Sequence, residues 1–454
     1  MVLTSSSGNV VSLKHVGIIG GGWAGLSAAT HLVDAGIEVS LFERSRILGG
    51  RSTSFWDKNF GEWLDHGQHI MIGAYREAFG LLKKWGSFSG IRFLPDGKIP
   101  WIMEDGKVHQ LDFSGSTFRT LYSILNFDFL NLSEKANLTA GLGKLKSYES
   151  KSHSIDLTVA EVLGSTMTQS EKLRYLFQAL SLAVMNAPLE VAAAAPLAMA
   201  IREGLLSSDH DGNIGYAYQP LKVIVNDAFL QWSKNRKLNV YPGSYVTDIG
   251  REAGFWKIEI KGNYSYFDAV IITGSPVELP RLLPSTNFGN IFSFVPSKFD
   301  YSPIAGIHCT FDREILDVPF AHLYNSKFQW IFGRGLKGSS GWNKVSFVVS
   351  DADESFKSSA GDVKEELLAD LHRRFPRSRN ANLTHFRLIN TRRATVVLTP
   401  SNLVDRPTDS RLFPNLHIAG DWLDTGLPAT IESAARSGRL TAENLISELK
   451  NYDR

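Results

Sequence analysis

The spacing of hydrophobic positions identifies one βαβ unit near the beginning of the chain. From His15, the sequence HVGIIGGGWAGLSAATHLVDAGIEVSLFERS starts with a short apolar strand and passes through glycines into an alanine-rich amphipathic helix. The helix pattern breaks at Gly36, and a second strand rich in β-branched residues follows. This order predicts an α/β fold with a doubly wound nucleotide-binding domain that begins near residue 14.

The rest of the chain alternates between helical and strand-like blocks. Residues 92–218 are aromatic-rich, and helices are expected at 168–185 and in the alanine-rich window 191–201. Strand patterns return at 238–275 and again after residue 304, and the chain closes with a strand, a turn and a helix. We therefore predict a discontinuous nucleotide-binding domain with an inserted mixed α+β substrate domain. The first comprises residues 14–91, 210–290 and 386–450, and the second comprises residues 92–209 and 291–385.

Composition narrows the class of protein. The 454 residues are 43% hydrophobic and 21% charged, with a formal net charge of +2, which is ordinary for a globular chain. Basic residues are spread out and nearly balanced by acids, so nucleic acid is not an expected partner. Cys309 is the single cysteine, which excludes an internal disulfide and a cysteine-based metal cluster. Any redox chemistry must therefore come from a cofactor.

We expect neither a signal peptide nor a membrane-spanning segment. The first sixteen residues lack a continuous apolar stretch of the kind that signal peptides carry. The most apolar window, VAAAAPLAMAI, contains Pro196 and falls short of the roughly 20 residues that a spanning helix needs. We expect a soluble, cytoplasmic protein, with room for peripheral contact to the inner membrane face.

The first glycine-rich turn has the arrangement of a dinucleotide site. Gly20, Gly22 and Gly25 follow the first strand in the pattern GxGxxG, and Glu43 ends the second strand. Gly20 would make the tight turn, Gly22 would admit a pyrophosphate, and Gly25 would let helix and strand pack. The helix N-terminus, with Ala24 in it, attracts phosphates, and Glu43 would accept hydrogen bonds from the adenosine ribose.

A second glycine pair follows in ERSRILGGRSTS. Gly49, Gly50 and Arg51 come a few residues after Glu43 and its neighbour Arg44, and they are either a surface loop or part of the same site. The pattern resembles the FAD-binding branch that includes amine oxidases and phytoene desaturases. That resemblance implies that the pair and its arginine lie along the flavin pyrophosphate. The segment GSYVTDI likewise resembles one whose valine backbone, here Val246, contacts adenine.

The C-terminal segment AGDWLDTGLPATIESAARSG supplies what a flavin needs. Asp421 can accept hydrogen bonds from ribityl hydroxyls. The helix expected to start near Pro428 points backbone N–H groups and its positive end toward the flavin pyrimidine edge, where it would stabilise a reduced flavin. The cofactor contacts expected here are Gly420, Asp421, Pro428, Ala429, Thr430 and Ile431. The predicted cofactor is FAD, held by a Rossmann-like domain.

The stretch LDHGQHIMIGAY admits three interpretations. Asp65, His66 and His69 offer ligands for a metal, but no second ligand cluster is visible and a flavoprotein needs none, so no metal is expected. The histidines can also simply satisfy hydrogen bonds in a turn. In the third interpretation, Gly67 and Gln68 lie against the flavin ring, with Asp65 or His69 nearby as a proton donor or an orienting group.

The resemblance extends beyond the cofactor. Four segments together look like the hydroxysqualene dehydroxylases, also called squalene-associated FAD-dependent desaturases. They are LDHGQHIMIGAYREAFGLLKKWG, APLEVAAAAPLAMA, TRRATVVLTPSNLVDRP and NLHIAGDWLDTGLPATIESAARSG. The resemblance implies that reduced FAD converts hydroxysqualene to squalene. In that family we expect asparagine more often where His66 stands, and a small polar residue where Leu423 stands.

Removing an allylic hydroxyl requires an acid, an apolar tunnel and a surface that shelters a cation. His69 and Asp65 are the candidates for the acid or its support. Arg392 and Arg393 either contact the cofactor or pair with acids. Aromatic faces stabilise cations, although such residues are more often plain core. The aromatic candidates are Trp63, Tyr75 and Trp422.

The expected substrate is an apolar triterpenoid, which partitions into lipid. We therefore expect peripheral membrane contact through the helical block between Phe113 and Met199. One alternative is a phytoene- or squalene-type desaturase that runs the flavin in the oxidising direction. Another is a prenyl-lipid carrier like the GDP-dissociation inhibitors, and an amine oxidase is the least favoured. The sequence does not identify the electron donor, and no nicotinamide site is evident.

Overall fold

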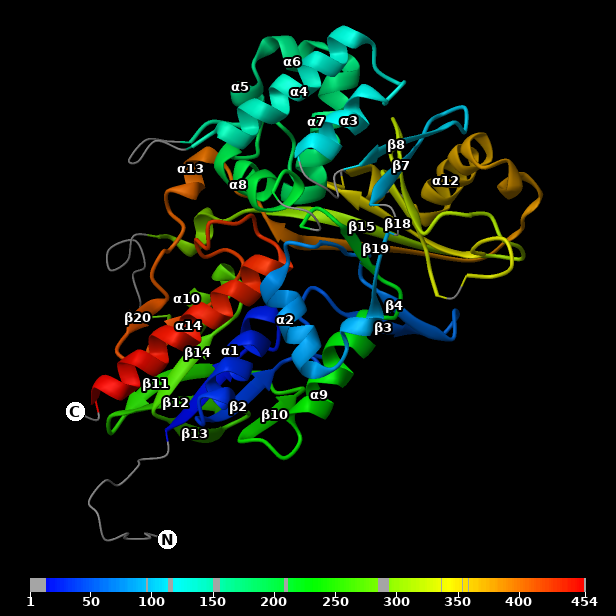
Figure 1. Ribbon diagram of the computed structural model, residues 1–454. Coiled ribbons are helices and arrows are strands. Elements are labelled where there is room, and N and C mark those ends of the chain that lie inside the picture. Colours follow the sequence, from blue (N-terminus) through cyan, green and yellow to red (C-terminus); the bar gives the residue numbers. More distant parts are fainter. Residues whose placement is uncertain are drawn as a thin grey trace.

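A six-stranded sheet with helices on one face forms the lower half of the molecule in Figure 1. The protein is described by a computed structural model covering residues 14–452 except 95–96, 113–116, 150–155, 208–210, 285–293, 336, 353 and 358. The strand order is β10-β2-β1-β14-β21-β20, and all neighbours are parallel except β20 and β21. The strands are β1 (His15–Ile19), β2 (Glu38–Glu43), β10 (Leu238–Pro242), β14 (Ala269–Ile272), β20 (Arg411–Phe413) and β21 (Leu416–Ile418).

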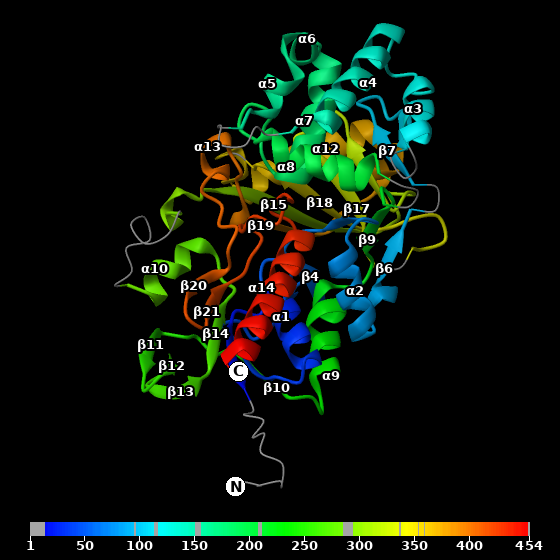
Figure 2. The ribbon, with the colours of Figure 1, turned by 60° about the vertical axis from the view of Figure 1, so that its left-hand side comes forward.

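Two layers cover this sheet. On one face lie α1 (Trp23–Asp34) and α14 (Ile431–Tyr452), which run side by side in Figures 1 and 2. The two helices approach closely because Gly438 carries no side chain, and a Cβ there would lie 2.1 Å from the carbonyl oxygen of Ala24. On the other face lie β11 (Asp248–Glu252), β12 (Phe255–Ile260) and β13 (Asn263–Phe267), and Ile258 fills the space above Gly17. This is the expected βαβ-based α/β architecture.

A seven-stranded sheet forms the upper half. Its order is β19-β15-β18-β17-β16-β7-β8. The strands are β7 (Lys98–Ile102), β8 (Val108–Asp112), β15 (Tyr301–Phe311), β16 (Phe320–Leu323), β17 (Trp330–Gly333), β18 (Lys344–Ser350) and β19 (Leu383–Val396). Helix α12 (Ala360–Arg374) covers one face with Val363, Leu367 and Leu371. The opposite face meets a group of helices, which occupies the top of Figures 1 and 2.

That group of helices is formed by the aromatic-rich block of the sequence. It comprises α3 (Thr117–Leu125), α4 (Leu132–Ser147), α5 (Val159–Leu163), α6 (Ser165–Gln169), α7 (Glu171–Met185) and α8 (Ala194–Ala200). Helix α4 begins with a capping box, in which the Asn131 side chain accepts from the N–H of Glu134 and the Glu134 carboxylate accepts from that of Asn131. None of the helices in the described residues is at once long and apolar enough to cross a membrane.

Shorter elements connect the two halves. The connecting helices are α2 (Arg76–Trp85), α9 (Ala228–Ser233), α10 (Leu279–Leu282) and α13 (Pro400–Leu403), and the strands are β3 (Ser54–Asp57), β4 (Glu62–Asp65), β5 (Ile70–Ile72), β6 (Ile91–Phe93) and β9 (Ile214–Ala217). Strand β5 pairs with β9 and precedes α2. The stretch LDHGQHIMIGAY, for which a turn was one interpretation, contains the end of β4, a loop and β5, and α2 follows it.

The proposed division into domains stays a prediction. Strand β19 begins at Leu383 and pairs with β15 along the upper sheet, so residues 386–396 lie in that sheet rather than in the lower one. Two expectations fall outside the described residues: the absence of a signal peptide, which concerns the first thirteen positions, and the start of the membrane-contacting block at Phe113.

Candidate functional site

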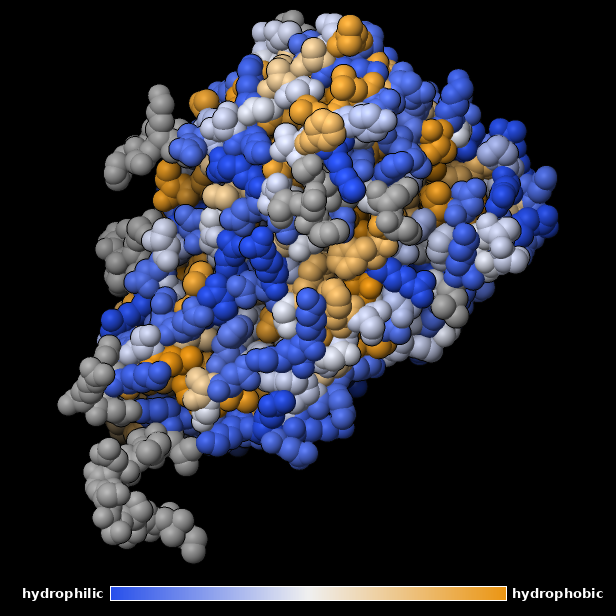
Figure 3. Space-filling model, in the orientation of Figure 1, coloured by the Kyte–Doolittle hydropathy of each residue, from blue (hydrophilic) through white to orange (hydrophobic). Residues whose placement is uncertain are grey.

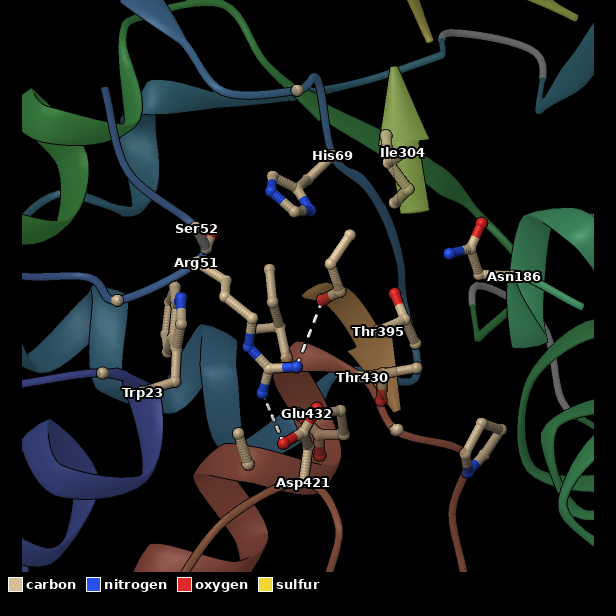
Figure 4. A pocket seen from close by; sticks show the side chains of 18 of the residues that line it. Trp23, Arg51, Ser52, His69, Asn186, Ile304, Thr395, Asp421, Thr430 and Glu432 are labelled. Atoms are coloured by element: carbon tan, nitrogen blue, oxygen red, sulfur yellow. Dashed lines mark hydrogen bonds and ion pairs between the residues drawn. The ribbon is translucent and has the colours of Figure 1, made fainter. Parts of the chain in front are cut away.

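One cavity of about 750 Å³ begins at the carboxyl ends of the parallel strands and extends upward into the helical part. This edge of a doubly wound sheet is where such folds bind ligands, and the volume lies in the range of roughly 300–1,000 Å³ that small molecules and cofactors occupy. Figure 4 shows the middle of the cavity, where Arg51, His69, Asp421 and Thr430 converge from separate segments.

Two glycine turns face each other at the lower end. The N–H of Gly49 donates to the carbonyl of Gly21 at 2.8 Å, and a Cβ on Gly50 would lie 3.1 Å from the Cα of Gly22. Gly20 has a φ of +110°, which side chains rarely tolerate, and a Cβ on Gly25 would lie 2.0 Å from the carbonyl oxygen of Gly20. The turn therefore carries no side chains where its backbone meets the cavity, and it is tightly packed where α1 meets β1.

The carboxylate of Glu43 closes the turn from the end of β2. It accepts from the N–H of Gly21 at 2.7 Å with one oxygen and from that of Ser45 at 2.7 Å with the other. Each oxygen keeps a second acceptor position for a ligand hydroxyl. Nearby, Val246 is buried, and its carbonyl accepts from Arg281 at 3.0 Å, while Arg44 is largely exposed at the rim.

An ion pair crosses the centre of the cavity. Arg51 Nη2 donates to Asp421 Oδ1 at 2.5 Å, and Arg51 Nη1 donates to the carbonyl of Ala394 at 3.1 Å, so the guanidinium joins three segments (Figure 4). Burial by itself would lower the pKa of Arg51, but attraction to Asp421 outweighs it, and the pKa of the guanidinium is raised. Arg51 stays a fixed cation that faces the cavity.

The N-terminus of α14 reaches the cavity next to this ion pair. Pro428, Ala429, Thr430 and Ile431 line the cavity, and the helix begins at Ile431, close to the expected start. The carboxylate of Glu432 turns away to accept from the N–H groups of Glu77 and Ala78, both at 3.0 Å, and so caps α2. The first turn of α14 thus presents backbone N–H groups to the site.

The imidazole of His69 enters the cavity on the opposite side, above Arg51 (Figure 4). Burial lowers the pKa of His69 to about 4, and the charges of Arg51 and His66 add to this effect. The ring is therefore neutral at neutral pH. Gly67 and Gln68 line the wall beside it, and Gly67 faces Ile304, since a Cβ on this glycine would lie 3.9 Å from the Ile304 side chain.

Asp65 occupies a different position from the expected one. Its carboxylate accepts from Ser54 Oγ at 2.6 Å, the N–H of Leu221 at 2.9 Å and Gln68 Nε2 at 3.3 Å, and its carbonyl accepts from His308 Nε2 at 2.9 Å. Burial raises the pKa of Asp65 to about 6. The carboxyl is not part of the cavity wall in the described residues. Of the two roles expected for Asp65, proton donor or orienting group, this position suits the orienting one, because the carboxylate holds Gln68 and the loop.

The three aromatic candidates, Trp63, Tyr75 and Trp422, differ in whether they reach the cavity. Tyr75 lines the cavity, and burial raises its pKa to about 12, so the phenol stays protonated. Trp63 packs on Trp56 and lies under the ammonium of Lys222, away from the cavity. Trp422 is buried against Phe294 and Phe299. The cation-stabilising role expected of Trp63 and Trp422 is corrected, since both serve packing.

Most of the residues predicted from sequence meet in this one cavity. Those that line it are Gly20, Gly22, Ala24, Glu43, Arg44, Gly49, Gly50, Arg51, Gly67, Gln68, His69, Val246, Gly420, Asp421, Pro428, Ala429, Thr430 and Ile431. Gly25 stands behind the turn and Asp65 behind the loop. Arg393 lines the wall and Arg392 does not, which separates two neighbours that the sequence could not rank. Within the described residues, no cluster of three or more His, Cys, Asp or Glu side chains is arranged to hold a metal ion.

Several wall residues were not predicted. Thr273 follows β14 and donates through Oγ1 to the carbonyl of Gly20 at 2.8 Å, and Tyr301 and Thr395 come from the upper sheet. Thr273 could have been predicted from the sequence, because it follows an apolar strand and the carboxyl ends of parallel strands lie at one edge of the sheet. Trp23 and Ser52 also line the wall, whereas only their neighbours in the two glycine motifs were predicted to do so.

The upper part of the cavity is apolar. Its walls come from α4, α7 and the cavity face of the upper sheet. The lining residues there include Ile70, Ile72, Ile99, Trp101, Leu138, Leu142, Leu176, Phe177, Ala179, Leu180, Ala183, Val184, Leu205, Ile304, Trp330, Phe332 and Val348. Such a wall offers almost no hydrogen bonds and favours a long hydrocarbon ligand. A polar end and an apolar end are thus joined in one cavity.

Comparison with known proteins places the chain in a family. The flavin-containing amine oxidoreductase family matches residues 23–446, and the chain belongs to it. Hydroxysqualene dehydroxylases of Sinorhizobium fredii and Rhodopseudomonas palustris are 24% and 26% identical to it, over 96% of this chain and 99% of each relative. The 15-cis-phytoene desaturase of an Oncidium hybrid is 25% identical over 96% of this chain and 78% of that protein.

Solved structures share the fold. An oxidoreductase from Methanosarcina mazei aligns with a TM-score of 0.72 at 15% identity, over 94% of this chain and all of that one. A putrescine oxidase bound to putrescine aligns with a TM-score of 0.68 at 14% identity, over 96% of this chain and 99% of that one. At these identities the likeness establishes the Rossmann-like architecture with its second, substrate-side domain, and no more.

The residues present fit the FAD that this family binds. The facing backbones of Gly22 and Gly50 carry no side chain that would cover the cavity, the side chains of Trp23 and Ser52 at this end have polar atoms without partners, and a cation and a helix N-terminus face the cavity. The chain is an FAD-dependent oxidoreductase. When bound, the flavin supplies hydride transfer, and the residues around Gly22, Glu43, Arg51 and Asp421 would hold it.

Proposed function

We propose that the protein removes the hydroxyl group of hydroxysqualene reductively to give squalene. The observation that carries this proposal is the continuity between the polar cofactor end of the cavity and the long apolar wall formed by α4, α7 and the upper sheet. The names of the relatives that match nearly end to end support the same substrate class. An apolar triterpenoid suits this wall because its hydrocarbon surface is removed from water along its whole length.

The reaction breaks the C–O bond and forms a C–H bond. The hydroxyl leaves as water after gaining a proton, and the carbon receives a hydride, so that one alcohol, one proton and one hydride give one alkene chain and one water. His69 is the polar side chain that we assign to the leaving hydroxyl. Its neutral ring donates a hydrogen bond to that oxygen with one nitrogen, and the proton of this nitrogen passes to the leaving oxygen while the other nitrogen takes up a proton that comes from solvent, so that the ring ends neutral. Asp65 positions the loop through Gln68.

Other wall residues protect the reacting carbon. Tyr75 presents an uncharged aromatic ring, which stabilises a developing cation. The apolar upper wall excludes water, which would otherwise return a hydroxyl to the cation. Arg51 stays charged and would contribute positive charge beside a reduced flavin held there.

The test is an anaerobic incubation of the purified holoprotein with chemically reduced FAD and hydroxysqualene, followed by lipid extraction and chromatography. Squalene in an amount that follows the amount of reduced flavin supports the proposal. Recovery of hydroxysqualene alone, with the protein folded and flavin bound, rejects it.

A desaturase acting on phytoene or squalene is the second candidate. The likeness to 15-cis-phytoene desaturase favours it, and the apolar wall would accept such a substrate equally well. The two candidates differ in the direction of hydride transfer, so the oxidised holoprotein with phytoene or squalene is the matching assay. The flavin family excludes a carrier without flavin chemistry, and an apolar wall offers no partner for a charged amine.

We also propose that α3 docks on a lipid surface, which would deliver an apolar substrate. Phe118 is 77% exposed, Tyr122 64% and Leu125 61%, and these side chains recur at the spacing of one helix face. Leu132, at the start of α4, is 79% exposed. Figure 3 shows apolar residues gathered at this end of the molecule. Arg119 and Lys135 stand beside them and suit an anionic headgroup layer.

A further inference from the structure

Three buried polar atoms in the wall of the cavity have no hydrogen-bond partner among the described residues. Nε1 of Trp101 belongs to the apolar upper wall, and the other two, Nε1 of Trp23 and Oγ of Ser52, lie at the polar end. Trp23 is 5% exposed and Ser52 is 4% exposed, so solvent does not satisfy either atom. Buried polar groups in folded proteins nearly always have a partner, and an exception at a ligand site marks a partner that binds there.

The two atoms come from the two glycine motifs. Trp23 is the first residue of α1, directly after Gly22, and Ser52 directly follows the Gly49, Gly50 and Arg51 run. The two segments are locked together by the hydrogen bond from Gly49 to Gly21. Figure 4 shows Trp23 and Ser52 on the same side of the cavity as the backbone of Arg51, across from Thr395 and Asn186.

Each side chain is held in place by groups other than its polar atom. The ring of Trp23 packs on that of Trp85 with centroids 5.9 Å apart. The backbone N–H of Ser52 donates to the carbonyl of Gly49 at 3.1 Å. The indole N–H is a donor only, and a hydroxyl can rotate to donate. The wall therefore keeps two donors preorganised beside the closely packed backbones of Gly22 and Gly50.

We propose that the indole N–H of Trp23 and the hydroxyl of Ser52 donate hydrogen bonds to oxygen atoms of bound FAD. Phosphate and ribityl oxygens are acceptors that two such donors beside the glycine turns would meet, whereas the hydrocarbon substrate proposed for the upper cavity has none to offer here. The proposal rests on flavin binding, which family membership establishes, and is independent of which substrate is reduced or oxidised.

The test measures FAD affinity and apoprotein stability in Trp23→Phe, Ser52→Ala and the double variant. Apoprotein is titrated with FAD to obtain the dissociation constant, and unfolding of apoprotein and holoprotein is followed in urea. Each single variant is expected to raise the FAD dissociation constant about tenfold, and the double variant about a hundredfold. Ser52→Ala is expected to leave the apoprotein as stable as the parent or more so, because it removes an unsatisfied buried group.

Two variants outside the cavity serve as controls. Trp256→Phe removes an indole whose N–H donates to the carbonyl of Pro414 at 3.1 Å, and Ser27→Ala removes a hydroxyl that donates to the carbonyl of Ala435 at 2.7 Å. Both lose a bond internal to the protein, so both should destabilise the apoprotein and leave the FAD dissociation constant within about twofold. The proposal is overturned if Trp23→Phe and Ser52→Ala bind FAD like the parent, which is the result expected if a buried water satisfies both atoms.

Discussion

The guanidinium of Arg51 and the carboxylate of Asp421 lie 2.5 Å apart, although 370 residues separate them in the sequence. Arg51 follows the second glycine pair after β2, and Asp421 follows β21 at the other side of the sheet. Their ion pair joins the two halves of the cofactor site that the sequence identified independently. The side chain of Asp421 is 8% exposed, so Arg51 is the cation that makes its burial tolerable.

Replacing Arg51 with Met is expected to weaken FAD binding at least tenfold and to lower the free energy of unfolding by about 2 kcal/mol, because Asp421 stays buried without its cation. Flavin absorbance after gel filtration and urea unfolding measure the two effects. Arg76→Met is the matched control, since Arg76 pairs with Asp211 at 3.2 Å but is 75% exposed and lies outside the cavity. Equal FAD retention in the two variants would contradict the account.

Replacing His69 with Ala is expected to lower turnover at least about a hundredfold while FAD stays bound, because the variant removes the group assigned to the leaving hydroxyl. Turnover is followed as squalene formed and FAD binding as flavin absorbance. His385→Ala, an exposed residue of β19, controls for loss of an imidazole elsewhere. Turnover at the parental rate would remove His69 from the mechanism.

Much of the site was predictable because its signals are local. The turn at Gly20 and Gly22, the acid at Glu43 and the helix after Pro428 each depend on residues within one βα or αβ segment, and local chain geometry largely determines them. The expectations that the structure corrects concern residues whose positions depend on contacts between distant segments. Trp422 was a candidate to face the cavity because it follows Asp421 in the sequence. In the structure Phe294 and Phe299 pack against it, and no local pattern indicates that contact.

Asp65 and strand β19 illustrate the same limit. The carboxylate stands next to His66 in the sequence, yet Leu221, more than 150 residues away, supplies a backbone donor that turns it from the cavity. Residues 386–396 look like the beginning of the last nucleotide-binding piece, but they pair with β15 and extend the other sheet. The unpartnered atoms of Trp23 and Ser52 are visible only when all neighbours are in place.

The buried carboxyl of Asp65 predicts a pH dependence of stability. Because its pKa is raised to about 6 in the folded chain, the folded state holds a proton that the unfolded state has lost between about pH 4 and pH 6. The stabilisation from this proton is complete below the unfolded pKa and is lost as pH rises through about 6. Relative to the parent, Asp65→Asn should gain about 2 kcal/mol in unfolding free energy between pH 4.5 and pH 7.5.

Urea unfolding of both proteins at the two pH values measures this difference. Asp105→Asn is the control, because Asp105 is exposed and its hydrogen bond with Lys107 lowers the pKa, so the pH trend should be small and of the opposite sign. A difference between Asp65→Asn and the parent that does not change with pH would show that Asp65 titrates normally in the folded protein.

Filling the apolar part of the cavity should weaken substrate binding without changing FAD binding. Ala183 lines the cavity from α7, and Ala183→Phe would fill space that a hydrocarbon chain needs. We expect KM for hydroxysqualene to rise at least tenfold with an unchanged FAD dissociation constant. Ala140→Phe, on the exposed side of α4, should change neither value. Parental KM in Ala183→Phe would place the substrate elsewhere.

The exposed face of α3 predicts binding to vesicles. The double variant Phe118→Ser and Leu125→Ser should lose most co-sedimentation with liposomes containing anionic phospholipid, because it removes the largest apolar side chains of that face. Tyr264→Ser, a half-exposed aromatic of β13 on the nucleotide-binding half, should sediment like the parent. Equal sedimentation of all three proteins, or of none, would exclude α3 as the docking element.

The most direct test of the central claim is a single turnover without oxygen. Stoichiometrically reduced holoprotein is mixed with hydroxysqualene, and flavin absorbance and the extracted lipid are followed together. The account predicts that flavin is reoxidised and that one squalene forms for each flavin. Flavin that stays reduced with hydroxysqualene intact, while the oxidised protein introduces double bonds into squalene or phytoene, would contradict it.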